Sequence, residues 1–365
     1  MTTPILDLPF GERPDPDEFI RAAMAWHFHP DTGSEFWLQR AKTLDFDPRT
    51  DIRTWDDLGL FPNVTDELRD VPAPQLIPRG YGTKPDVAGI IESGGTTGAP
   101  KCLPLLYDYA NRMVQRDMYQ FEQYGIQHGK NWLSITPSGP HGAFEEVRRS
   151  AREWGSLVFT VDMDPRWVKK QMSAGNAAEA GAYAEHILDQ ATYAFRLQNI
   201  GYLRLTPPVL ARIAGREELV DNVNQNVDVI TWGGASMDAD SRDFYRRELF
   251  PNVNIVAGFG TTMALGSCAA ERLGVDSDDA ILDPTIDPYS TFQVRSPDTG
   301  EVVEYGERGQ LVVHHVSKSF LLPNNAERDS VIRHAPSRLD QLGDSIGGIA
   351  PLDAFKGVEV IEGVY

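Results

Sequence analysis

The residues with the clearest capacity for chemistry form one short stretch, Ser93-Gly94-Gly95-Thr96-Thr97-Gly98-Ala99-Pro100-Lys101. Its first six positions hold three glycines and three hydroxyl residues, which cannot pack a core but can direct several backbone N–H groups toward one point. With Lys101 at the rim, such a loop can hold a chain of phosphates, because amide dipoles and a cation share the negative charge. It is not the Walker loop, since Pro100 separates the last glycine from the lysine. A flexible surface turn is the alternative interpretation.

The surrounding pattern indicates the elements that would position this loop. Apolar, strand-like residues 87–91 precede it, and an amphipathic helical pattern at about 107–124 follows it. Farther along, short apolar strands alternate with helical patterns, which predicts parallel β–α–β units. We therefore expect an α/β fold with wound, mostly parallel sheets flanked by helices.

Other glycine-bearing turns follow predicted strands of the same sheet. Gly233-Gly234-Ala235-Ser236 comes after the strand at 227–232, and Gly258-Phe259-Gly260-Thr261-Thr262 after the strand at 254–257. Active sites of wound sheets lie beyond the carboxyl ends of the strands, so these segments point to a nucleotide crevice. His141 and Gly142 occupy the turn after a further strand at 132–136, where a histidine is either structural or a ligand contact.

With its order of Thr, Gly, Pro and Lys, the stretch 93–101 resembles the phosphate loop of the adenylate-forming (ANL) superfamily, which comprises acyl- and aryl-coenzyme A ligases, nonribosomal adenylation domains and luciferases. Segment 233–235 is similar to the family segment along adenine, and 258–262 to its aromatic-Gly-x-Thr loop. Gly343-Asp344 is similar to the end of its Thr-Gly-Asp motif. The resemblance covers about residues 85–365.

The resemblance implies a role for each matching residue. The β- and γ-phosphates would be held by Ser93, Gly94, Gly95, Thr96, Thr97, Gly98 and Lys101. The rest of the nucleotide would be bound by Gly233, Gly234, Ala235, Ser236, Gly258, Phe259, Gly260, Thr261, Thr262 and Asp344, with Phe259 on adenine, Thr262 at the α-phosphate and Asp344 at the ribose. The acid would be bordered by His141, Gly142, Trp232 and Gly260. Lys101, His141 and Thr262 are the implied catalytic residues.

Two positions depart from the family pattern. Met263 stands where the family has a glutamate that binds Mg²⁺, and Leu342 replaces the threonine before Gly343-Asp344. A thioether is a poor ligand for hard Mg²⁺. ATP and Mg²⁺ are still the implied cofactors, but we assign no protein metal ligand. Phosphate oxygens and water, or another carboxylate, would have to bind the ion.

Length and pattern predict two parts. Residues 1–270 would form the wound α/β part that binds nucleotide and acid, and 271–365 a β-rich sub-lobe with antiparallel strands. Its strand-like residues 314–315 are adjacent histidines that face opposite ways, which disfavours a two-histidine metal site. In the family a hinge and a C-terminal domain with a catalytic lysine follow. Since the chain ends at Tyr365, where the family has its hinge, we expect that domain to be absent.

Composition excludes several other classes of function. A formal net charge of −19 argues against a nucleic-acid partner. The two cysteines, Cys102 and Cys268, suit a reducing compartment. No secretory signal and no apolar run of about 18 residues is visible, so we expect a cytoplasmic protein without a membrane partner.

The combined expectation is an acid–AMP ligase of the phenylacetate–CoA ligase-like branch, similar to truncated aryl-acid adenylating enzymes of phenazine and benzoxazole antibiotic biosynthesis. It would adenylate an aromatic carboxylic acid with ATP in secondary metabolism, and pass it to a thiol or amine of an acceptor enzyme, coenzyme A or a carrier protein. A full acid–CoA or amide ligase is one alternative. A non-catalytic protein that binds AMP and an aryl acid is another.

Overall fold

An eleven-stranded sheet runs through the computed structural model, which describes residues 4–93, 99–275, 277 and 279–352 and the backbone of 354–355 and 358–359. Its strands, in chain order, are β3 (Asn131–Ile135), β4 (Val158–Thr160), β5 (Ile200–Leu205), β6 (Val229–Trp232), β7 (Asn254–Thr261), β8 (Gly266–Glu271), β9 (Leu282–Pro284), β10 (Ser290–Arg295), β11 (Arg308–Val316), β12 (Leu321–His334) and β13 (Ser345–Pro351). In space their order is β10-β11-β12-β13-β9-β8-β7-β6-β5-β3-β4.

Strand β7 joins a parallel and an antiparallel half of this sheet. Residues 254–257 pair in parallel with β6, and β3, β4 and β5 continue the parallel half. Residues 258–261 of the same strand pair antiparallel with β8, and the remaining strands continue that pattern. The predicted sub-lobe strands near 291–295 and 310–316 are β10 and β11, and they belong to this antiparallel half.

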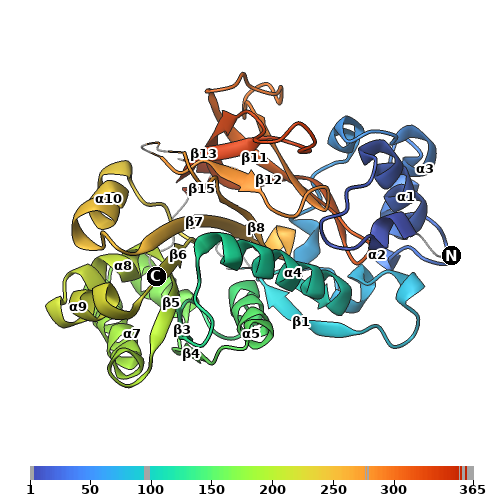
Figure 1. The fold of residues 1–365 in the computed structure, drawn as a ribbon. Coiled ribbons are helices and arrows are strands. Elements are labelled where there is room, and N and C mark those ends of the chain that lie inside the picture. Colours follow the sequence, from blue (N-terminus) through green and yellow to red (C-terminus); the bar gives the residue numbers. More distant parts are fainter. Residues whose placement is uncertain are drawn as a thin grey trace.

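Helices cover both faces of the parallel half (Figure 1). On one face α4 (Tyr107–Tyr124) and α5 (Gly142–Trp154) pack Phe121 and Val147 against Trp132 and Tyr202. On the other, α7 (Ala177–Leu197), α8 (Pro207–Ala214) and α9 (Glu217–Asn226) cover the alternate strand residues, which point the opposite way. The remaining helical segments of this part are α6 (Pro165–Ser173), α10 (Ala239–Phe244), a π-helical turn (Tyr245–Leu249) and a 3₁₀ turn (Thr262–Ala264). The predicted fold class is confirmed.

The N-terminal region lies against the antiparallel strands, at the far end of the molecule from α7 and α9 (Figure 1). It contains α1 (Pro16–His27), α2 (Glu35–Arg40), α3 (Pro48–Asp51) and 3₁₀ turns at Pro4–Asp7, Ala41–Thr43, Asp56–Leu60, Glu67–Arg69, Ala73–Leu76 and Arg79–Tyr81. The indole N–H groups of Trp26 and Trp37 donate to the carbonyls of Lys318 and Leu321, both at 2.9 Å. These bonds hold the helices to the β11–β12 turn and to the start of β12.

Two local predictions were wrong. Strand β2 (Cys102–Leu106) was not predicted. It pairs antiparallel with β1 (Val87–Glu92), so a hairpin rather than a strand–loop–helix unit flanks the predicted phosphate loop. The strand predicted at 254–257 is also longer, since β7 continues through Gly258 to Thr261, where β8 supplies hydrogen-bond partners. A second small hairpin consists of β14 (Ala354–Phe355) and β15 (Val358–Glu359).

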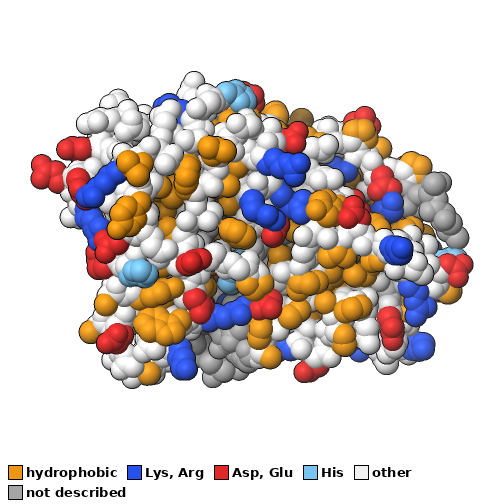
Figure 2. Space-filling view, turned by 90° about the horizontal axis from the view of Figure 1, so that it is seen from below, with side chains coloured by type: hydrophobic (Ala, Val, Ile, Leu, Met, Phe, Trp, Pro, Cys, Tyr) orange, Lys and Arg blue, Asp and Glu red, His pale blue; other side chains and the backbone are white. Residues whose placement is uncertain are grey.

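Charged and hydrophobic side chains are mixed on the surface. On the face shown in Figure 2, the Lys and Arg side chains of the described residues lie in small groups between acidic and hydrophobic ones. None of the described helices combines the length and the apolar character that a membrane crossing would need.

Candidate active site

Two neighbouring cavities lie where β6 and β7 end. The inner cavity, of about 260 Å³, is bounded by the sheet and by α4 and α5. The outer cavity, of about 700 Å³, is bounded by β7, β12 and β13. Trp232, Gly234 and residues 257–262 line both of them. A shared wall of this kind can hold two joined parts of one ligand, or two ligands that react with each other.

Most of the predicted site residues line these cavities. Those on the inner cavity are His141, Gly142, Trp232, Gly233, Gly234, Gly258, Phe259, Gly260, Thr261 and Thr262. Those on the outer cavity are Trp232, Gly234, Ala235, Ser236, Gly258, Phe259, Gly260, Thr261 and Thr262. Three segments that are far apart in the sequence therefore meet at one place, as the wound-sheet argument predicts.

Glycine is required where the segments touch. A Cβ on Gly233 would stand 2.6 Å from the carbonyl oxygen of Gly258, so the β6 turn and β7 lie in backbone contact. A Cβ on Gly260 would stand 2.8 Å from the carbonyl oxygen of Gly266, and Gly234 has a φ of +82°. Any larger residue would separate the strands that form the shared wall.

Phe259 is held by packing rather than by hydrogen bonds. Its ring meets that of Phe292 edge-on, with centroids 6.2 Å apart and planes at 78°, and it packs on the core of the antiparallel half. A ring so supported, on the wall of both cavities, presents a flat apolar surface that suits a planar ligand.

The predicted phosphate loop is only partly described. Its ends close the β1–β2 hairpin, because the Ser93 N–H donates to the Lys101 carbonyl at 3.0 Å and the Lys101 N–H donates to Ser93 Oγ at 2.9 Å. Gly94, Gly95, Thr96, Thr97 and Gly98 lie outside the described residues, so their contact with phosphate stays a prediction. Burial and then the charge of Arg69 lower the pKa of the Lys101 amine, while Asp66 and Glu327 oppose this shift.

Glu327, which no pattern in the sequence indicated, is bonded to β7 and acts on Lys101 through its charge. Thr261 Oγ1 donates to Glu327 Oε1 at 2.7 Å, and Asn325 Nδ2 donates to the same oxygen at 2.8 Å. Burial raises the pKa of Glu327, although these hydrogen bonds act against the shift. Glu327 lines the outer cavity, as does Thr262. The only indication in the sequence was that position 263 lacks a carboxylate. No pattern indicated which residue would replace it.

His141 stands at the N-terminus of α5, on the wall of the inner cavity. Burial and then the charge of Arg166 lower the pKa of its imidazole, and Glu92 acts in the opposite direction. Arg166 and Glu92 are themselves paired at 2.5 Å. A neutral histidine at a helix N-terminus can donate or accept one hydrogen bond to a ligand in this cavity.

Two buried polar atoms on the wall of the inner cavity have no partner among the described residues, Trp232 Nε1 and Thr206 Oγ1. An unpaired buried donor costs about 1–3 kcal/mol of stability, so such groups usually meet a ligand or water.

Asp344, like Ser93 and Lys101, is a predicted site residue that lines neither cavity. Its Oδ1 accepts from Arg333 Nε at 2.8 Å and its Oδ2 from the Val294 N–H at 3.2 Å. Burial raises its pKa against the charge of Arg333. It is not among the described residues that line either cavity. Its contact with ribose stays a prediction.

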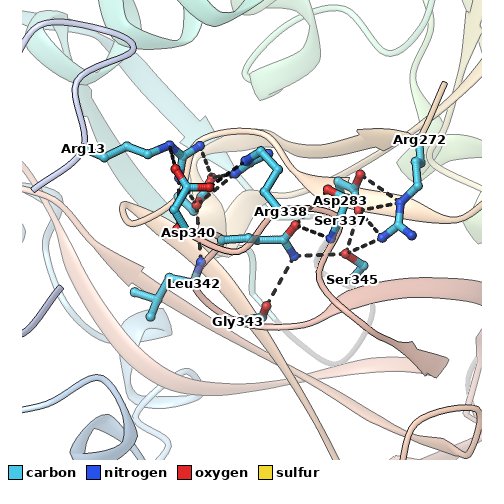
Figure 3. A network of polar contacts seen from close by, with 11 residues as sticks. Arg13, Arg272, Asp283, Ser337, Arg338, Asp340, Leu342, Gly343 and Ser345 are labelled. Carbon is cyan, nitrogen blue, oxygen red and sulfur yellow. Dashed lines mark hydrogen bonds and ion pairs between the residues drawn. The ribbon is translucent and has the colours of Figure 1, made fainter. Parts of the chain in front are cut away.

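The segment before Asp344 is held by two groups of ion pairs and hydrogen bonds (Figure 3). In one, Asp287 pairs with Arg13 and Arg338. In the other, Asp283 accepts from Arg272 and from Ser345 Oγ. The chain around Asp344 is therefore fixed by both groups. To bind a ligand, the Asp344 carboxylate would have to give up its bond to Arg333.

The inner cavity is backed by a buried ionic cluster, which we define as Arg116, Asp117, Glu146 and Arg204. Glu146 Oε1 accepts from Arg116 at 3.1 Å and from Arg204 at 3.2 Å, and its Oε2 accepts from Ser267 N and Oγ at 3.1 and 2.9 Å. Burial acts to raise the pKa of Glu146, but the two arginines hold it below its ordinary value. Burial raises the pKa of Asp117 to about 6, against the charge of Arg116. With two cations and two anions the ionised cluster has no net charge.

Met263 is buried, and it lines neither cavity. Among the described residues, no group of three or more His, Cys, Asp or Glu could hold a metal ion. His314 and His315 face opposite ways as predicted, His314 toward Trp55 and His315 toward Tyr109.

Comparison with known proteins agrees with the fold. No family model matches the chain. Over 247 residues, 67% of the chain, the sequence is 22% identical to a 4-coumarate–CoA ligase-like protein of Oryza sativa subsp. japonica, and this match covers 40% of that protein. The chain thus matches less than half of the relative's length.

Among solved structures, the chain is similar to 2-hydroxyisobutyryl-CoA ligase. In complex with 2-HIB-AMP and CoA, that enzyme matches at a TM-score of 0.62 and 13% identity, over 90% of this chain and 66% of its own. In the postadenylation state with R3-HIB-AMP it matches at 0.62 and 12% identity, over 94% and 70%. The chain has the fold of an adenylate-forming acyl-CoA ligase, and matches two thirds of that ligase's length.

Proposed function

We propose that the chain is an adenylate-forming enzyme, which converts ATP and an aromatic carboxylic acid into the acyl-AMP and pyrophosphate. The observation that carries this proposal is the meeting of 233–236, 258–262 and His141 at two cavities with a shared wall. The solved ligase with this fold is described with an acyl-AMP. In this proposal the acid occupies the inner cavity, and the nucleotide the outer one.

The protein must mainly align the carboxylate with the α-phosphorus and neutralise charge, because this attack needs little proton transfer. Lys101 and the loop 93–98 would neutralise the departing pyrophosphate, Thr262 would contact the α-phosphate, and Phe259 would support adenine. His141 and Gly260 would border the carboxylate. Trp232, whose Nε1 has no partner among the described residues, lines both cavities.

Acid-dependent exchange of labelled pyrophosphate into ATP tests the proposal. Purified chain should catalyse exchange with at least one aromatic acid of a panel, and not without acid. Absence of exchange with every acid, together with calorimetric binding of AMP or an acid, would favour the alternative of a non-catalytic binding protein. Thioester detected after addition of coenzyme A would extend the proposal to a complete acid–CoA ligase, and amide formation to an amide ligase. A role in secondary metabolism, the phenylacetate–CoA ligase-like branch and a cytoplasmic location rest on the sequence alone.

We also propose that Glu327 takes the place of the missing glutamate at 263 in binding Mg²⁺ together with ATP. Mg²⁺ is commonly held by one or two carboxylates plus substrate phosphates, so one carboxylate in the cavity that Thr262 also lines fits it. When bound, the ion neutralises phosphate charge. Oε1 of Glu327 is used by Thr261 and Asn325, whereas none of the described residues contacts Oε2 through a hydrogen bond.

Glu327→Gln should weaken the binding of ATP in the presence of Mg²⁺ by at least about tenfold, because a hydrogen bond or contact to a charged group is worth about 1.5–3 kcal/mol. Calorimetry with Mg²⁺ and with EDTA measures this. Asp329→Asn, two residues farther along β12 on the same cavity, is the matched control and should keep the Mg²⁺ effect. An Mg²⁺ effect of wild-type size in Glu327→Gln would contradict the assignment.

A further inference from the structure

The inner cavity extends away from the nucleotide side, toward the start of β5. Its wall includes Thr206 near the end of that strand, then Arg204, then Tyr202. Four residues of strand span roughly 13 Å. An acid whose carboxylate lies at Gly260 and His141 would therefore direct its other end toward Tyr202, Thr231 and Gln120.

This end of the cavity carries two hydroxyls among aromatic side chains, since Phe121 and Tyr124 also line it. Tyr202 and Thr231 join their hydroxyls at 2.6 Å, and both line the cavity. The pair has two hydroxyl protons but uses only one between its two oxygens, so a donor remains free whichever residue donates. Gln120 also lines the cavity, and no hydrogen bond joins its amide to the described residues.

The charge behind this end is balanced. Arg204 approaches the cavity, but its guanidinium donates to Glu146 and to Ser267 Oγ, the latter at 2.8 Å. Since the ionised cluster is neutral overall, a second carboxylate or an ammonium on the ligand would meet no compensating charge. A neutral hydrogen-bonding group suits this end best.

We infer that the acid carries a hydroxyl or amino substituent remote from its carboxylate, bound by the Tyr202–Thr231 hydroxyl pair and Gln120. This inference rests on the proposed function, because it places the carboxylate at Gly260 and His141. A hydrocarbon end would leave the free hydroxyl donor and the Gln120 amide without partners, which disfavours its binding. Sites built to hydrogen-bond a substrate group discriminate strongly against analogues that lack it.

The test compares benzoate with 3-hydroxybenzoate, 4-hydroxybenzoate and 3-aminobenzoate. The readouts are calorimetric binding in the presence of AMP and the kcat/KM for pyrophosphate exchange. At least one substituted acid should be preferred over benzoate by about tenfold or more, which corresponds to ~1.4 kcal/mol. Thr231→Val should reduce that preference to about threefold or less, and Tyr202→Phe should do the same without changing the shape of the wall.

Thr192→Val is the matched control, since Thr192 is a buried threonine whose hydroxyl donates to Leu188 O within α7, away from both cavities. It should retain the wild-type preference. Benzoate bound as tightly as all three substituted acids, or a preference unchanged in both variants, would overturn the inference. Selective binding of a substituted acid without any exchange would reject the proposed adenylation while retaining this inference. Binding of no acid at all would overturn both.

Discussion

Replacement of Glu146 by Gln should lower the free energy of unfolding by about 3–5 kcal/mol, because it leaves the buried Arg116 and Arg204 short of one negative charge. Both guanidiniums donate to Glu146 Oε1, and Glu146 is 4% exposed. Gln keeps the size of the side chain, so the loss would report charge and hydrogen bonding rather than a cavity. Urea unfolding of the purified variant, followed by fluorescence, measures the change.

The neighbouring residue provides the control. Glu145 lies on the same helix and pairs with Arg148 and Arg149 nearer the surface, at 3.2 and 3.5 Å. Glu145→Gln should cost less than about 1 kcal/mol. The double variant Glu146→Gln/Arg204→Gln loses one cation as well as one anion. Its free energy of unfolding should therefore fall by less than the sum of the two single changes. A Glu146→Gln protein as stable as Glu145→Gln would show that the cluster contributes little.

Acid should destabilise the protein strongly through three buried histidines. Burial lowers the pKa of His27 to about 4 and that of His314 and His315 to about 3. His314 Nδ1 accepts the Asn324 N–H at 3.1 Å, and His27 Nδ1 has no partner among the described residues, so neither ring gains from a second proton.

The direction follows from proton binding. Between the unfolded pKa near 6.5 and these folded values, the unfolded chain binds more protons, so this contribution is complete above about pH 6.5 and is lost as the pH falls. Each histidine should cost roughly 2 kcal/mol between pH 7 and pH 5, and the three together about 5–6 kcal/mol.

Urea unfolding at several pH values measures the proton uptake on unfolding. His27→Gln, His314→Gln and His315→Gln should each reduce the slope of the unfolding free energy against pH by about one proton in this range. A slope unchanged in all three variants would contradict the assignment. The rings lie where the N-terminal helices meet β11 and β12, since His27 Nε2 donates to the Ser317 carbonyl at 2.6 Å. Acid is therefore expected to loosen that junction first.

Local patterns predicted most elements of the wound half correctly. The helix at 107–124 was placed correctly because its apolar face is periodic and because Gly125, with a φ of +79°, ends it. Strand β2 was not predicted, because an apolar run of five residues beside a predicted loop has no period that distinguishes a hairpin strand from a connecting segment.

The chain's own sequence determined Gly233 and Gly260, because only glycine permits the backbone contact of the β6 turn with β7 at 233 and of β7 with β8 at 260. Sequence also showed that position 263 has no carboxylate. Tertiary structure alone decided that Glu327 approaches Thr261, that Arg333 holds Asp344, and that Glu146 joins two arginines behind the inner cavity. These partners lie 11 to 66 positions apart. The pattern of neighbouring residues determines the conformation of a segment. The partner of a buried charge depends instead on which strands pair and on where the helices cross them.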